Sequence, residues 1–321
     1  MAVPNEILGP RPENADLIFI GGTGRSGTHV LSHLLGSHSQ YARVPIECRF
    51  HCNPQGFPDL LSGRVDAETF LKKLKKFWWR RIRAGEVAPV VAKRLAFGRK
   101  VRGLHKIVPQ ERFDAAVAEF EANYPLDLEG ACRNLFFDLL WPLTVEQGKP
   151  GLTEMSCFTI AESPTLQRLF PDAKLIHTVR DGRDAGASKV GKRQKRDHPR
   201  DGLEGIAWWE RRLRRIDASA REVRPGRLLT ISLDELAYGD REGSYRRLLE
   251  FLELDDEPGI RAYFDREVTT ENAHRDRWRA GLSDQAQEEL RRTYEDALER
   301  LAADGVEGAA ELRRTYERTP A

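Results

Sequence analysis

A glycine-rich segment near the N-terminus carries the residues best suited to chemistry. The segment Gly21-Gly-Thr-Gly-Arg-Ser-Gly-Thr-His29 combines four glycines and three hydroxyl side chains with one arginine and one histidine. Glycines let the backbone approach an oxygen atom closely and leave N–H groups able to bind an anion, and the arginine adds a positive charge. The residues expected to hold a phosphate group are Gly24, Arg25, Ser26, Gly27, Thr28 and His29.

The residues after the last glycine separate this loop from that of a nucleotide kinase. The spacing Gly22-x4-Gly27 is shared with kinases, but Thr28 replaces the phosphate-binding lysine and His29 replaces the hydroxyl residue that binds Mg²⁺. Such a loop suits a nucleotide whose transferred group needs no divalent ion. A sulfuryl group fits this description, because it bears less negative charge than a terminal phosphoryl group. We therefore expect no metal at this site.

The elements on either side of the loop must fix its position. The apolar residues 17–20 predict a short buried strand, and the apolar pattern from Val30 to Leu35 predicts a helix that ends at Gly36. A strand, a glycine turn and a helix in this order direct backbone N–H groups and the positive end of the helix dipole at a bound anion. A loop of this type without any ligand is the alternative.

A carboxylate and a second arginine follow in residues 41–50, which are predicted to be extended by their β-branched residues and Pro45. Glu47 and Arg49 are two residues apart, so a strand would place both on the same side, facing the ligand. Glu47 is therefore a candidate general base, with Arg49 as its positioning partner. A Glu-x-Arg pair alone is more commonly a surface ion pair, and its place after the first strand–helix unit is what favours catalysis.

A second strand end repeats this arrangement. Residues 173–179 predict a buried strand that leads into the polar turn Arg180–Asp184 and then into a helix containing Ser188. Arg180 is placed to bind a second phosphate through two guanidinium nitrogens, and Ser188 to donate a hydrogen bond to it. The alternative is a capping network of Asp and Arg side chains at a strand end.

The segment Lys72–Lys106 is strongly basic, with thirteen lysines and arginines and the single acid Glu86. Its centre alternates aromatic and cationic residues. Such a run could bind an anionic acceptor or a lipid surface, or form a solvated face above buried tryptophans.

Composition limits the remaining possibilities. The formal net charge is only +2, so we expect no nucleic-acid partner. The N-terminus lacks the pattern of a signal peptide and no apolar run is long enough to span a membrane, which favours a cytoplasmic protein, membrane-peripheral if the basic segment binds lipid. Cys48, His51 and Cys52 lie close together, but no second Cys/His pair at zinc-finger spacing accompanies them.

With both loops in view, the sequence resembles the sulfotransferases that use 3′-phosphoadenosine-5′-phosphosulfate (PAPS). Thr23–Thr28 resembles the family's 5′-phosphosulfate loop, and Arg180–Ser188 is similar to its 3′-phosphate motif. The pattern is closest to the tyrosylprotein sulfotransferases and their bacterial relatives, which implies a catalytic base at Glu47 with Arg49 beside it. Met155 stands where relatives often have a lysine, so one expected cation is missing.

We therefore predict one α/β domain over residues 1–321, with a P-loop-like parallel sheet flanked by helices. Residues 1–15 form an extended lead-in, residues 60–150 a mostly helical insertion, and the C-terminal segment is helical. The implied reaction moves a sulfuryl group from PAPS to a hydroxyl of a glycan, lipid, peptide or small molecule, leaving adenosine 3′,5′-bisphosphate. The alternatives are a P-loop nucleotide kinase and a non-catalytic module that binds nucleotides or polyanions.

Overall fold

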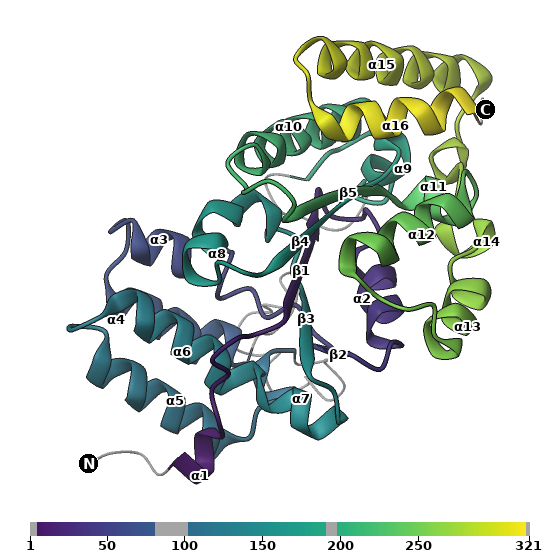
Figure 1. The fold of residues 1–321 in the computed structure, drawn as a ribbon. Coiled ribbons are helices and arrows are strands. Elements are labelled where there is room, and N and C mark those ends of the chain that lie inside the picture. Colours follow the sequence, from purple (N-terminus) through teal and green to yellow (C-terminus); the bar gives the residue numbers. More distant parts are fainter. Residues whose placement is uncertain (1–4, 81–101, 191–197, 319–321) are drawn as a thin grey trace, which may run out of the picture.

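A five-stranded parallel sheet forms the centre of the protein (Figure 1). The computed structural model describes residues 5–80, 102–190 and 198–318. The sheet has the spatial order β2-β3-β1-β4-β5, and each neighbouring pair is parallel. The strands are β1 (Leu17–Gly22), β2 (Tyr41–Arg43), β3 (Gly151–Met155), β4 (Lys174–Val179) and β5 (Leu228–Ser232). The predicted fold class, a parallel sheet flanked by helices, is confirmed.

The register of the strands brings the predicted loops to one edge of the sheet. On the two sides of β1, Ile20 is paired with Met155 of β3, and Gly22 with Thr178 of β4. The chain therefore leaves β1, β3 and β4 at the same carboxyl edge, which is where open α/β sheets bind their ligands.

Side chains of β1 alternate between two hydrophobic layers. Ile18 and Ile20 pack with α2 (Thr28–Gly36), α12 (Arg241–Leu252) and α13 (Pro258–Glu267) on one face. Leu17 and Phe19 belong to the layer on the other face, which contains most of the helical insertion. All six residues of β1 are buried, as expected for the central strand of a parallel sheet.

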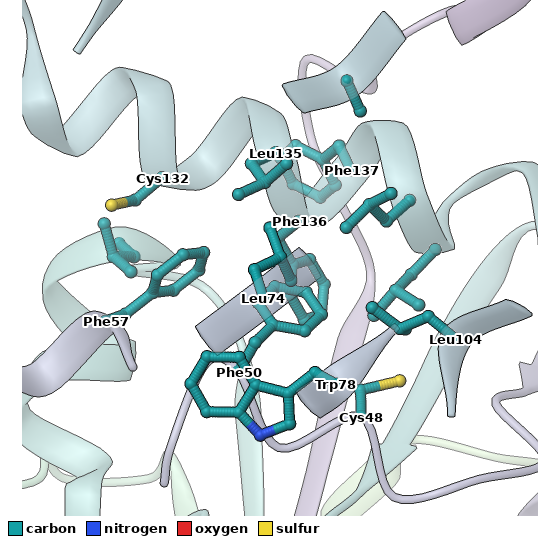
Figure 2. Close-up of a cluster of buried hydrophobic side chains, with 14 of the residues drawn as sticks. Cys48, Phe50, Phe57, Leu74, Trp78, Leu104, Cys132, Leu135, Phe136 and Phe137 are labelled. Atoms are coloured by element: carbon teal, nitrogen blue, oxygen red, sulfur yellow. The ribbon is translucent and has the colours of Figure 1, made fainter. Parts of the chain in front are cut away.

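The described part of residues 60–150 is mostly helical. Figure 2 shows its core, in which Phe136 and Trp78 belong to the same buried cluster as Phe50 and Phe57 from the preceding segment. Residues 81–101 of the basic segment Lys72–Lys106 lie outside the described residues. The elements are α3 (Phe57–Leu61), α4 (Ala67–Lys73), the π-helix η1 (Leu74–Trp78), the 3₁₀-helix η3 (Leu104–Lys106), α5 (Gln110–Asn123), α6 (Leu128–Leu140) and α7 (Pro142–Gln147).

The second half of the chain adds helices around β4 and β5 (Figure 1). They are η4 (Ile160–Glu162), α8 (Ser163–Leu169), α9 (Gly182–Ala187), α10 (Gly202–Ala220), α11 (Leu233–Ala237), α14 (Thr270–Ala273), η5 (Arg277–Arg279), α15 (Asp284–Ala303) and α16 (Glu307–Arg318). The long helices α15 and α16 pack together and against α10. Among the described residues, no helix has the length and apolar character needed to cross a lipid bilayer.

Two glycines let α9 and α10 approach backbone to backbone. A Cβ atom on Gly186 would lie 2.7 Å from the carbonyl carbon of Gly205, which no side chain larger than hydrogen tolerates. This contact fixes α10 beside the turn that follows β4. The predicted extended lead-in differs from the structure at its centre, where Asn5–Leu8 form the short helix α1. Burial of Leu8 in the core holds this turn in place.

Candidate functional site

The loop between β1 and α2 has a backbone shaped for an anion. Gly24, Arg25 and Gly27 have positive φ angles of 86°, 66° and 94°. Arg25 adopts a conformation that costs free energy for any residue except glycine, and such positions cluster at functional sites. The turn leads directly into Thr28, the first residue of α2, so that the amino end of this helix faces the loop.

Hydroxyl groups attach the loop to the sheet. The Ser26 hydroxyl shares a hydrogen bond of 3.0 Å with the hydroxyl of Thr178 on β4. Thr178 in turn donates to the carbonyl oxygen of Gly21, at 3.1 Å. Ser26 therefore helps to hold the loop in place, in addition to its predicted contact with phosphate.

The two predicted phosphate loops meet in the structure. The Nε of Arg25 donates a hydrogen bond of 2.7 Å to the hydroxyl of Ser188, which caps the carboxyl end of α9. Burial, together with the charges of Arg180 and Arg277, lowers the pKa of Arg25. The arginines thus repel one another, and a bound anion would relieve this repulsion.

Arg180 is buried and already has protein acceptors. One terminal nitrogen donates to the carbonyl oxygen of Arg25 at 3.4 Å, and the other donates to the carbonyl oxygens of Ala273 and His274. Its guanidinium also lies 3.6 Å from the Asp184 carboxylate. Both terminal nitrogens of Arg180 therefore already have acceptors, whereas its buried Nε has no hydrogen-bond partner among the described residues.

Asp184 links this region to the C-terminal part of the chain. Its carboxylate accepts hydrogen bonds from the backbone N–H groups of Asp276 and Trp278, both at 3.1 Å. Burial and the neighbouring Asp181 raise the pKa of Asp184 to about 7. The segment around Trp278 is therefore attached to the helix that follows β4.

The segment that carries Glu47 is not a continuous strand. Strand β2 ends at Arg43, and Arg49 has a φ of 69°, so the prediction of a strand that places both side chains on one face is wrong. Glu47 and Arg49 nevertheless meet, since the Nε of Arg49 donates to the Glu47 carboxylate at 2.8 Å. The other Glu47 oxygen accepts a hydrogen bond of 3.1 Å from the thiol of Cys157, in the loop after β3.

A buried carboxylate explains why this segment leaves the sheet. Glu154, at the end of β3, accepts hydrogen bonds from the hydroxyl of Ser156 at 2.7 Å and from the backbone N–H of Cys48 at 3.4 Å. The Ser156 hydroxyl accepts from the backbone N–H of Arg49 at 3.3 Å. The backbone on both sides of Glu47 is therefore anchored to the end of β3.

The same carboxylate pairs with a buried histidine. The second oxygen of Glu154 lies 2.9 Å from the Nε2 of His51, and both side chains are inaccessible to solvent. Burial opposes a charge on His51, but the Glu154 carboxylate outweighs it and raises the pKa of His51 to about 10. His51 thus acts as the cation of a buried ion pair. No group of His, Cys, Asp and Glu in the described parts of the chain could hold a metal ion.

This pair predicts a pH dependence of stability. Because the pKa of His51 rises from 6.5 to about 10 on folding, its contribution is complete below about pH 6.5 and is lost as the pH rises towards about 10. Each pKa unit by which the value for His51 in the folded state exceeds that in the unfolded state adds about 1.4 kcal/mol to the free energy of unfolding. Urea unfolding across this range should show a falling free energy of unfolding. The double variant His51→Leu/Glu154→Leu should show a flatter profile, and an unchanged slope would contradict the pairing.

The sequence also singled out His29 and Met155. His29 lies in the first turn of α2, where partial desolvation and the charge of Arg25 lower its pKa. Met155 is fully buried in the apolar layer beneath α2 and brings no charge to the site. An arginine that the sequence did not single out, Arg212 on α10, instead reaches the loop and donates to the carbonyl oxygen of Thr23 at 3.0 Å.

Comparison with known proteins gives one family and several similar structures. Residues 16–258 match the model of a family described as the sulfotransferase family. No curated protein matches the sequence. The structure is similar to the sulfotransferase domain of the olefin synthase from Synechococcus PCC 7002, with 18% identity, a TM-score of 0.48, and coverage of 89% of this chain and 96% of that one.

Two mycobacterial sulfotransferases are similar in structure, with comparable identities and TM-scores. The sulfotransferase STF9 from Mycobacterium avium has 17% identity and a TM-score of 0.43, over 91% of this chain and 79% of that one. The sulfotransferase STF1 from Mycobacterium tuberculosis H37Rv has 13% identity and a TM-score of 0.42, over 88% of this chain and 76% of that one.

Proposed function

The chain belongs to the sulfotransferase family, and on that premise we propose that it transfers a sulfuryl group from PAPS to a hydroxyl of an acceptor. The observation that carries this proposal is the hydrogen bond between Arg25 and Ser188. It joins the loop after β1 to the turn and helix after β4, which supports the proposal that both loops bind the same nucleotide. The proposed reaction requires no metal ion.

Each side chain of the site has a distinct role in this reaction. Glu47 takes the proton from the acceptor hydroxyl, whose oxygen attacks the sulfur while the bond between sulfur and the 5′-phosphate oxygen breaks. Arg49 and the Cys157 thiol hold the Glu47 carboxylate in position. Arg25, the backbone N–H groups of the loop and the dipole of α2 stabilise the charge that develops on the departing phosphate.

The other end of the nucleotide falls to Arg180 and Ser188, as the resemblance implies. Ser188 already positions Arg25, so binding of the 3′-phosphate and binding of the 5′-phosphosulfate are coupled through one hydroxyl. The acceptor is a hydroxyl-bearing glycan, lipid, peptide or small molecule. The basic segment Lys72–Lys106 is the candidate surface for an anionic acceptor or a membrane.

Calorimetry tests the proposal most directly. We expect adenosine 3′,5′-bisphosphate to bind at least about tenfold more tightly than adenosine 5′-monophosphate without added metal, since one charge-assisted contact is worth about 1.5–3 kcal/mol. The variant Arg180→Gln should remove most of this preference. Binding that requires Mg²⁺ and favours ATP would instead support a kinase. Transfer of ³⁵S from labelled PAPS to an acceptor would exclude a non-catalytic module.

A further inference from the structure

Arg212 lies against the phosphate loop in a fixed orientation. Its guanidinium donates to the carbonyl oxygen of Thr23 at 3.0 Å. It also lies over two aromatic rings, 4.7 Å from the centre of Phe158 and 4.8 Å from the centre of Trp208. Stacking on both rings restricts the plane of the guanidinium, so that its N–H groups keep their direction without a ligand.

Arg212 has no carboxylate as an ion-pair partner among the described residues. Neighbouring arginines of α10 pair with acids, Arg214 with Glu210 and Arg215 with Glu162. Within the described residues, no acid lies within ion-pair distance of Arg212. Burial lowers the pKa of Arg212, which means that desolvation of its charge is not compensated. A half-buried cation without a carboxylate partner is costly, and an anion at this position would offset the cost.

The position of Arg212 indicates which anion would bind to it. A Cβ atom on Gly24 would lie 3.8 Å from a terminal nitrogen of Arg212 and 3.7 Å from the sulfur of Cys157. The Cys157 thiol donates to Glu47, the candidate base. Arg212 therefore approaches the loop on the side where Glu47 would deprotonate the acceptor, whereas Arg25 is held by Ser188.

We propose that Arg212 binds the sulfuryl oxygens of the donor and stabilises them while the group is transferred. The inference rests on the proposed function, and it assigns the two cations different tasks. Arg25 contacts the phosphate that leaves with the nucleotide, and Arg212 contacts the group that moves to the acceptor. A guanidinium has five N–H donors, so the bond to Thr23 leaves others for the ligand.

The test compares two nucleotides that differ only by the sulfuryl group. In Arg212→Met, the affinity for PAPS should fall by about 10–100-fold, whereas that for adenosine 3′,5′-bisphosphate should change by less than about threefold. Arg212→Lys should recover part of the loss because it keeps the charge. Both affinities can be measured by calorimetry on the same preparation, so their ratio does not depend on the fraction of folded protein.

The controls separate this inference from the proposed function. Arg211→Met removes an exposed arginine from the same helix and should leave both affinities unchanged. If the Arg212→Met variant loses affinity for both nucleotides equally, or for neither, Arg212 does not contact the sulfuryl group. If the unmodified protein binds neither nucleotide, the proposed function itself fails, and this outcome is distinguished before any variant is made.

Discussion

Replacing Glu47 with glutamine should reduce sulfuryl transfer by about 10²–10⁴-fold and leave the affinity for adenosine 3′,5′-bisphosphate nearly unchanged. The amide keeps the size of the side chain and still accepts a hydrogen bond, but it cannot take a proton from the acceptor. Glu47 is suited to this task because Arg49 and Cys157 bind different carboxylate oxygens. Single-turnover transfer of ³⁵S, measured together with calorimetry, separates the chemical step from binding.

Cys157→Ala is the matched control for this prediction. It removes one hydrogen bond to the Glu47 carboxylate without removing the carboxylate, so its effect on transfer should be much smaller. Near-normal turnover of Glu47→Gln with the natural acceptor would exclude Glu47 as the base. A loss of nucleotide affinity equal to the loss of turnover would instead indicate that Glu47 maintains the structure of the site.

The sequence predicted the elements that depend on short-range patterns. The glycines after residues 17–20 led to β1, the turn and α2, and the strand predicted for residues 173–179 became β4 (Lys174–Val179). That the loops after β1 and β4 lie near each other could also be anticipated for parallel strands, which leave the sheet at one edge.

What the sequence could not show depends on contacts between distant residues. Glu154 sits among strand residues, and only its contacts with His51 and Cys48 show why the chain departs from β2 before Glu47. Arg212 is one of several arginines on α10, and periodicity does not indicate which one faces the loop. In both cases the informative observation is a buried charge whose partner lies far away in the chain.

The second large effect is expected at Arg25. We expect Arg25→Met to lower the rate of transfer by about 10²–10³-fold, the usual cost of removing one preorganised donor to a developing negative charge. Its guanidinium is held by Ser188 before any ligand binds, so little reorganisation is needed when charge moves onto the departing phosphate. The positive φ of Arg25 supports the same conclusion, because the loop accepts a strained residue at this position.

Two further variants decide what the Arg25 side chain contributes. Ser188→Ala leaves the charge of Arg25 but removes its hydrogen-bond acceptor, and should therefore cost less than Arg25→Met. Arg25→Lys keeps a charge without the planar fork, and should fall between these two variants. If Arg25→Lys were as active as the unmodified protein, charge alone would be sufficient. If Arg25→Met kept full activity, the leaving phosphate would have to be stabilised by the loop N–H groups and α2 without this arginine.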